Sequence, residues 1–91
     1  MNVEVEVKTH KGSLLGVGVS EENLELLRVN FNPSNMKEID FIKILGAAMM
    51  TVIDRYGEDP RTSAIARTNI ETACMYAVKS MTAPVVERRK E

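Results

Sequence analysis

The fold is decided by the stretch Ile39-Asp-Phe-Ile-Lys-Ile-Leu-Gly46-Ala-Ala-Met-Met-Thr-Val-Ile53-Asp-Arg-Tyr56-Gly57-Glu-Asp59-Pro60. Apolar side chains recur in it at spacings of three and four, which is the period of an α-helix. One row contains Ile39, Ile42, Gly46, Met49, Ile53 and Tyr56, and a second contains Phe41, Leu45, Ala48 and Val52. The opposite, polar face holds Asp40, Lys43, Ala47, Thr51 and Asp54. The pattern predicts a helix to about Tyr56 with more apolar surface than one neighbouring helix covers.

The residues after Tyr56 predict a second, antiparallel helix. Gly57 is suited to end the first helix in a left-handed conformation. Asp59 and Pro60 are favoured at the N-cap and the first position of the next helix, which we expect to reach Met81 or Thr82. Small side chains in both helices favour a close crossing, because 46–48 is Gly-Ala-Ala and the expected inner row of the second helix is Ala66, Ile70, Ala73, Ala77 and Met81.

The first helix is preceded by Asn32-Pro-Ser-Asn35, a turn and helix-start segment. Asn35 with Glu38 three residues later fits an Asn-type capping box, and Ser34 is an alternative cap. The segment predicts a sharp beginning for the helix shortly after Pro33.

The N-terminal third is expected to be β-rich. Residues 2–9 alternate polar and apolar, and 14–19 return as a second strand after a turn at 10–13. Residues 24–31 fit both periods, because Leu24, Leu27 and Phe31 suit a helix whereas Leu27, Val29 and Phe31 suit a strand. We favour a third strand ending at Phe31, since an isolated hairpin is marginal.

Composition limits the classes of function. The chain has 91 residues, 12 Lys+Arg against 13 Asp+Glu, and a net charge of −1, which argues against binding a DNA or RNA polymer. One Cys and one His make no disulfide or zinc site, so neither a metal nor a cofactor is expected. No run predicts a membrane span or a signal peptide. We therefore expect one cytoplasmic α+β domain over 1–91, with a β-rich part (1–31), a helical hairpin (32–82) and a charged, frayed tail (83–91). So short a chain favours self-association.

Two groups of residues are candidates for ligand binding. Phe31, Asn32, Ser34 and Asn35 place an aromatic ring and polar groups before a helix N-terminus, where phosphate is favoured, and Lys43 lies two turns further on. The ring could stack on a base. The residues alone favour packing and capping instead, with Lys43 as a partner of Asp40.

The second group lies on the second helix. Thr68, Thr72, Met75 and Lys79 share a face that suits a polar pocket at a symmetry axis, and Arg67 adjoins it. The alternative for Arg67 is a surface pair with Glu71. Catalytic motifs are absent, so the sequence predicts a binding protein and not an enzyme. Cys74 is expected to be a buried small hydrophobe, the methionines core or interface residues, and His10 a solvated turn residue.

Several short motifs resemble a known family. They are Asn30-Phe-Asn-Pro-Ser34, Ile42-Lys43, Gly57-Glu-Asp-Pro60, residues 65–73 and Met75-Tyr-Ala-Val-Lys79. Over about residues 30–82 they resemble the helical-hairpin domain of phage nucleotide-sponge proteins, the anti-CBASS and Thoeris anti-defence proteins. The resemblance implies a homohexamer that sequesters cyclic nucleotide immune signals without degrading them, in the host cytoplasm during infection.

The resemblance also implies roles for individual residues. Phe31 would stack on a base, with polar contacts from Asn32, Ser34 and Asn35, and Lys43 would approach a phosphate, in a pocket for cyclic dinucleotides or a cyclic ADP-ribose isomer. Arg67, Thr68 and, less closely, Thr72 would belong to a separate cyclic-trinucleotide pocket. The strands before residue 30 resemble the Thoeris-type branch, although they are shorter. The rival hypotheses are a structural oligomerisation or protein-binding module without a nucleotide ligand, and an enzyme that cleaves such nucleotides.

Overall fold

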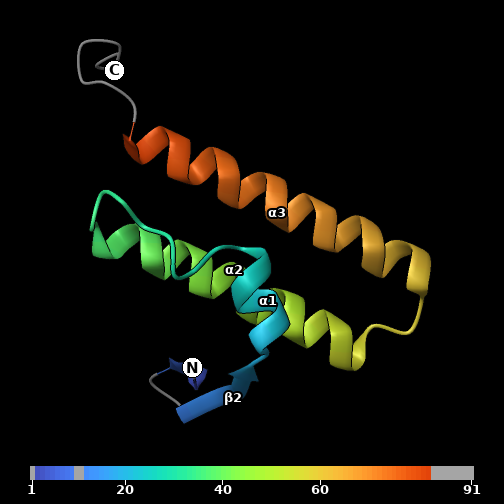
Figure 1. Cartoon of the computed structure of the whole chain (residues 1–91). Coiled ribbons are helices and arrows are strands. Elements are labelled where there is room, and N and C mark those ends of the chain that lie inside the picture. Colours follow the sequence, from blue (N-terminus) through green and yellow to red (C-terminus); the bar gives the residue numbers. More distant parts are fainter. Residues whose placement is uncertain (1, 10–11, 83–91) are drawn as a thin grey trace, which may run out of the picture.

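The computed structural model describes residues 2–9 and 12–82. Its elements are β1 (Val3–Thr9), β2 (Gly12–Val19), α1 (Glu21–Leu26), α2 (Lys37–Tyr56) and α3 (Pro60–Thr82). The predicted α+β class and antiparallel helical hairpin are confirmed, since α2 and α3 run side by side (Figure 1). The expected frayed tail at 83–91 and the turn residue His10 lie outside the described residues.

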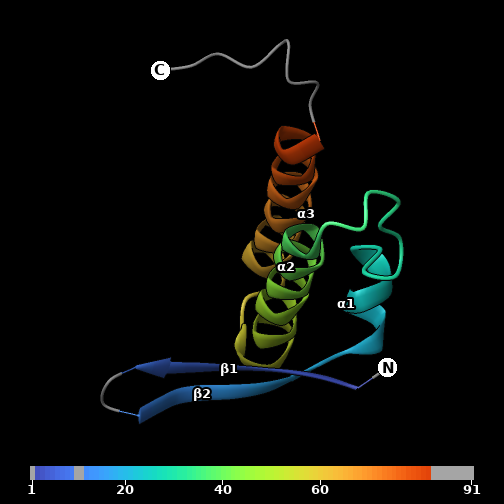
Figure 2. The same cartoon turned by 90° about the vertical axis from the view of Figure 1, so that its left-hand side faces the viewer.

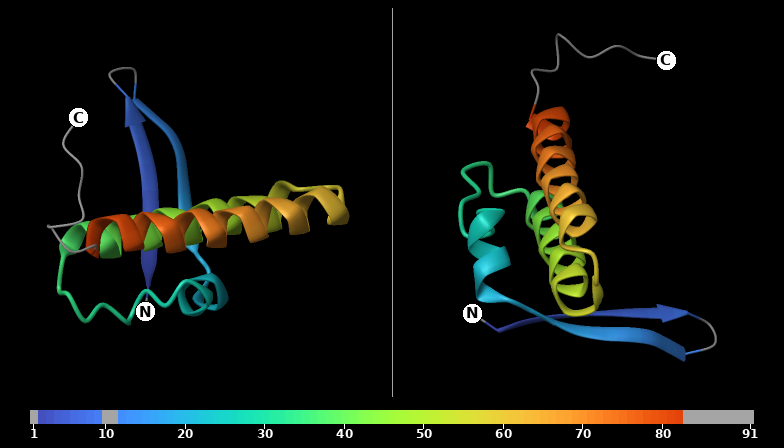
Figure 3. Two further views of the ribbon diagram at one scale, coloured as in Figure 1. Left: turned by 90° about the horizontal axis from the view of Figure 1, so that it is seen from above. Right: turned by 90° about the vertical axis from the view of Figure 1, so that its right-hand side faces the viewer.

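The predicted β-hairpin is confirmed, with Val3 opposite Val19 and Val5 opposite Val17. The alternation of the sequence explains its one buried face, because Val17 and Val19 are buried and Val3 and Val5 pack against the core cluster that contains Val19. The sheet lies across α2, on the side away from α3 (Figures 2 and 3). The molecule therefore has three layers, namely sheet, α2 and α3.

The third strand that we expected over 24–31 is wrong, because this segment contains the end of α1 and a turn. Ser20 is the N-cap of α1, and its hydroxyl accepts a hydrogen bond from the backbone N–H of Asn23. Acidic residues in the first turn also favour a helix start. Leu24, Leu27 and Val29 are buried in the core, so the apolar residues that suggested a strand serve a helix and its following turn.

The capping box predicted at the start of α2 and the left-handed Gly57 predicted at its end both need correction. The N-cap of α2 is Met36 without a side-chain cap, and Asn35 has a positive φ of 60°, so the capping box is absent. Gly57 is extended (φ −73°, ψ 127°), not left-handed. A Cβ at Gly57 would lie 2.5 Å from Ser63 Oγ, which explains the glycine by close approach.

The start of α3 follows the prediction. Asp59 Oδ2 accepts hydrogen bonds from the backbone N–H of Thr62 at 3.3 Å and from its hydroxyl at 2.8 Å. These bonds hold the pKa of the Asp59 carboxyl below its ordinary value. Pro60 is the first residue of α3, as its fixed φ favours.

The polar face predicted for α2 is wrong, because Lys43, Ala47 and Thr51 on that face are buried. The reason is that α1 packs beside α2 (Figure 2). Asn23 of α1 donates to Thr51 Oγ1, and Lys43 donates to the Arg28 carbonyl oxygen in the turn after α1. The exposed side of α2 is instead apolar. We call it the α2 apolar face, and its residues are Phe41, Leu45, Met49 and Tyr56.

The predicted close crossing of α2 and α3 is confirmed at Gly46. A Cβ at Gly46 would lie 2.5 Å from Cys74 Sγ and 2.8 Å from Leu27 Cδ1. Ile70 is buried at the contact, but Ala73 of the expected inner row is exposed. The half-buried Cys74 takes its place, and its thiol donates to the Ile42 carbonyl oxygen at 3.9 Å. The helices approach closely because Gly46 has no side chain.

Candidate functional site

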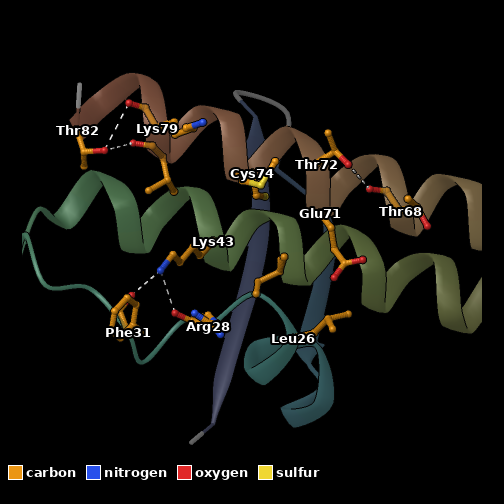
Figure 4. Close-up of a pocket in the computed structure, with 13 residues that line it drawn as sticks. Leu26, Arg28, Phe31, Lys43, Thr68, Glu71, Thr72, Cys74, Lys79 and Thr82 are labelled. Carbon is orange, nitrogen blue, oxygen red and sulfur yellow. Dashed lines mark hydrogen bonds between the residues drawn. The ribbon is translucent and has the colours of Figure 1, made fainter. Parts of the chain in front are cut away.

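A hollow of about 570 Å³ lies over α2, between α3 and the end of α1 with the turn that follows it (Figure 4). Its walls are mostly apolar with a few convergent polar groups, which is the usual character of a small-molecule site. From α1 and the turn it takes Leu26, Leu27, Arg28 and Phe31, and from α2 Lys43. One face of α3 completes it with Thr68, Glu71, Thr72, Cys74, Met75, Val78, Lys79 and Thr82.

Lys43 is the most unusual residue of the hollow, because its charged side chain is only 8% exposed. Its ammonium donates hydrogen bonds to the carbonyl oxygens of Arg28, at 3.0 Å, and Phe31, at 2.5 Å. Within 2–9 and 12–82 it has no ion pair with a carboxylate. A buried charge is costly unless an opposite charge compensates it. An anion in the hollow would supply that charge and occupy the third donor of the ammonium.

Phe31 presents an exposed ring beside this cation. The residue is 57% exposed, and the centroid of its ring lies 5.8 Å from the Lys43 ammonium nitrogen and 5.9 Å from the Arg28 guanidinium carbon. Arg28 has a positive φ of 55°, and its carbonyl oxygen also accepts from the backbone N–H of Phe31 at 2.9 Å. The turn therefore places a ring suited to stacking next to two positive charges.

The charge of the hollow differs from the charge of the whole chain. Among the described residues of the lining, three are cationic, namely Arg28, Lys43 and Lys79, whereas Glu71 is the single acidic one. The chain as a whole carries −1. Positive charge is therefore concentrated where a small anion fits, and the site is suited to phosphate groups next to a planar base.

The sequence model described as "Acb2/Tad1, hairpin domain" matches residues 26–82, more than half of the chain. The chain belongs to the Acb2/Tad1 hairpin-domain family. This is the family of phage anti-defence sponges for cyclic nucleotides, so the resemblance seen in the sequence is confirmed. The family is known for sequestration, not for an enzymatic activity. Neither a curated protein nor a solved structure matches the chain.

The Acb2/Tad1 match contains all the described residues that line the hollow, from Leu26 to Thr82. The β-hairpin lies before the match. The residues that line the hollow therefore lie within the part of the chain that matches the family, while β1 and β2 lie before that part.

Three predicted ligand contacts are placed away from the hollow of this Acb2/Tad1 domain. Asn32 Nδ2 donates to the Met36 carbonyl oxygen at 2.8 Å and to Asp40 Oδ1 at 3.1 Å. Ser34 Oγ donates to Asn32 Oδ1 at 2.7 Å and accepts from the Met36 backbone N–H at 3.2 Å. Asn35 is exposed with a left-handed backbone. Asn32 and Ser34 thus organise the loop between Phe31 and α2, and their contact with a ligand stays a prediction.

Arg67 is also separate from the hollow. It donates to Asp54 Oδ1 at 2.7 Å and to Asn23 Oδ1 at 3.1 Å, so the surface pair with Glu71 is not formed. Asn23 is buried and donates in turn to Thr51 Oγ1 and Asp54 Oδ2, both at 3.1 Å. This network ties α3 to α1 and α2. Of the two predicted sites, the structure brings Phe31, Lys43, Thr68 and Thr72 to one hollow and leaves Arg67 outside it.

Sequence reasoning missed Arg28 and Glu71 as site residues. Arg28 lies in the segment that we assigned to a strand, and it has no local motif. Glu71 was considered only as a partner of Arg67. A helical interpretation of 21–26 from its Ser20 cap would have placed Arg28 just after a helix end. Thr68, Thr72, Met75 and Lys79 line the hollow, and their predicted place in a pocket at a symmetry axis stays a prediction.

The described part of the chain gives little support for thiol or metal chemistry. Burial raises the pKa of the Cys74 thiol, which keeps it protonated. Residues 2–9 and 12–82 contain no group of three His, Cys, Asp or Glu side chains able to hold a metal ion. Among these same residues, no helix is both long and apolar enough to cross a membrane.

Proposed function

We propose that this protein sequesters a cyclic nucleotide immune signal intact, and so inhibits CBASS- or Thoeris-type immunity in the host cytoplasm. The ligand is a cyclic di- or trinucleotide or a cyclic ADP-ribose isomer. The observation that carries the proposal is Lys43, a buried cation with carbonyl partners at the edge of an open hollow. A phosphate would complete its coordination and neutralise its charge.

The hollow suits such a ligand in size and chemistry. Its volume of about 570 Å³ lies within the usual range for small-molecule sites. Lys43, with Arg28 and Lys79, would hold the phosphates, and the exposed ring of Phe31 would stack on a base. Stacking on an aromatic ring contributes about 1–3 kcal/mol per base. The rest of the surface has no net positive charge to follow a polymer, so a compact anion is the better fit.

We further propose that the protein acts as a homo-oligomer, with a hexamer expected from its family. The α2 apolar face supports this, because Phe41 is 62% exposed, Met49 56% and Tyr56 64%. Such exposed apolar surface typically marks an interface. A separate cyclic-trinucleotide pocket with Arg67, Thr68 and Thr72 would be completed by other copies at a symmetry axis.

The α2 apolar face also favours the second candidate, a structural oligomerisation or protein-binding module with no nucleotide ligand. In that case the apolar face is the functional surface, and Lys43 only fastens the turn between α1 and α2. The two candidates differ in whether the purified protein takes up a nucleotide.

One experiment separates the candidates. The purified full chain is titrated calorimetrically with cyclic di- and trinucleotides and cyclic ADP-ribose isomers, then denatured, and the released ligand is analysed by mass spectrometry. We expect tight binding and recovery of intact ligand. An altered ligand would indicate an enzyme, and no binding across the panel would leave the structural module.

A further inference from the structure

Glu71 places a carboxylate in a hollow where the other charged residues that the structure describes are cations. We propose that Glu71 selects the ligand by its base, by accepting hydrogen bonds from the Watson–Crick edge of guanine. This inference rests on the proposed function, since it concerns the same hollow. It adds a determinant of specificity to residues that bind any nucleotide through phosphate and ring stacking.

The first step is that Glu71 has no side-chain partner within the part of the chain that the structure describes. The cation one turn before it, Arg67, is held by Asp54 and Asn23. Within 2–9 and 12–82, Glu71 forms neither an ion pair nor a side-chain hydrogen bond, although Arg28, Lys43 and Lys79 line the same hollow. Its side chain is half-buried. A carboxylate held there without a partner is available to a ligand.

The second step is where the side chain points. Figure 4 shows Glu71 reaching from α3 toward Leu26, whereas Lys43 points toward Phe31 and Arg28. The ammonium bonds to the carbonyl oxygens of those two residues fix that direction for Lys43. The Glu71 carboxylate and the Lys43 ammonium therefore point toward different parts of the hollow. This arrangement suits a ligand with phosphate at one end and a base edge with neutral hydrogen-bond donors at the other.

The third step concerns which donor edge fits. A carboxylate is acceptor-only and repels phosphate, so it contributes to binding only through neutral N–H groups of the ligand. Guanine offers two adjacent donors, N1–H and the N2 amino group, that match two carboxylate oxygens in a paired geometry. Adenine offers one amino donor beside an acceptor nitrogen, which opposes the second oxygen. Cytosine and uracil each offer a single donor. Guanine is therefore the base that Glu71 favours.

Substitution by glutamine gives a sharp test, because Glu71→Gln keeps the shape and turns one oxygen into a donor. An amide presents an acceptor beside a donor, which matches the donor and acceptor of adenine. Cyclic di-GMP and cyclic di-AMP are titrated into the wild-type protein and the variant. We expect the wild type to bind cyclic di-GMP about tenfold more tightly or better, and the variant to lose or reverse this preference.

The matched control is Glu58→Gln, which removes a carboxylate of the exposed α2–α3 connection outside the hollow and should leave the preference unchanged. A wild type that binds both dinucleotides, with a ratio that Glu71→Gln does not change, overturns the role of Glu71 while the sponge stands. A wild type that binds no cyclic nucleotide overturns both. A change in self-association alone would assign Glu71 to a contact between copies.

Discussion

The ammonium of Lys43 donates a hydrogen bond over 2.5 Å to the carbonyl oxygen of Phe31, so a buried cation on α2 fixes the aromatic residue at the rim of the hollow. The same ammonium nitrogen lies 5.8 Å from the centroid of the Phe31 ring. The Lys43 side chain therefore both carries the buried positive charge and holds the aromatic ring of Phe31 that is available for stacking. Loss of the cation should affect both the phosphate contact and the position of the ring.

Lys43→Met is expected to weaken binding of a cyclic dinucleotide by about tenfold or more. A charged hydrogen bond contributes about 1.5–3 kcal/mol, and methionine keeps most of the length of the side chain without its charge. Stability should change less, because the lost bonds to two carbonyl groups are offset by the removal of a buried charge. Calorimetric titration measures binding, and thermal denaturation measures stability.

The matched control for this prediction is Lys37→Met, which removes the same charge from the exposed first residue of α2. Lys37 does not line the hollow, so binding should remain within a factor of two or so of the wild type. If both variants lose affinity equally, general electrostatics and not a Lys43–phosphate contact accounts for binding.

Two phenylalanines should separate ligand binding from self-association. Phe31→Ala removes an exposed ring from the hollow and should cost about 1–3 kcal/mol of binding while leaving the oligomer intact. Phe41→Ala removes a similarly exposed ring from the α2 apolar face and should weaken assembly. Calorimetry and light scattering on both variants make the comparison. Dissociation of the oligomer by Phe31→Ala would show that this ring mainly packs between copies.

The helical hairpin was predictable from sequence because its signals are local. The apolar rows from Ile39 to Tyr56 have one period, and Asp59 and Pro60 mark the next helix start. The element that could not be predicted in the same way was α1, a helix of six residues. Residues 24–31 fit both helical and strand periods, and a helix so short gives too few repeats to decide between them. The local signal that favours a helix here is the N-cap at Ser20.

The wrong strand prediction over 24–31 also affected the prediction of the candidate site. With 24–31 treated as a strand, the row of α2 with Lys43, Ala47 and Thr51 was interpreted only as a polar face, without the neighbouring helix that buries it. Phe31 and Lys43 were still named, because their chemistry was visible in the sequence. Their mutual contact was not, since it depends on how the turn after α1 folds back over α2. Arg28 lines the hollow because the same turn after α1 folds back over α2, and no local sequence pattern predicts this.

Arg67→Ala should reduce stability and, if a separate trinucleotide pocket exists, abolish binding of cyclic trinucleotides only. The buried amide oxygen of Asn23 would lose its donor from Arg67, which costs about 1–3 kcal/mol. Asp54→Asn is the matched variant, because it breaks the ion pair and leaves the arginine charge in place. Equal loss of dinucleotide and trinucleotide binding in Arg67→Ala would count against two distinct pockets.

The thiol of Cys74 can detect a ligand in the hollow without any substitution, because it belongs to the single cysteine of the chain and lines the hollow. Burial raises the pKa of its thiol, so little of the reactive thiolate is present near neutral pH. Alkylation by iodoacetamide should therefore be slower than that of glutathione, and slower again with saturating cyclic dinucleotide, which would cover the sulfur. Mass spectrometry follows the modified fraction over time. A labelling rate that saturating ligand leaves unchanged would place the ligand elsewhere, because an occupant of this hollow lies against the wall that Cys74 forms.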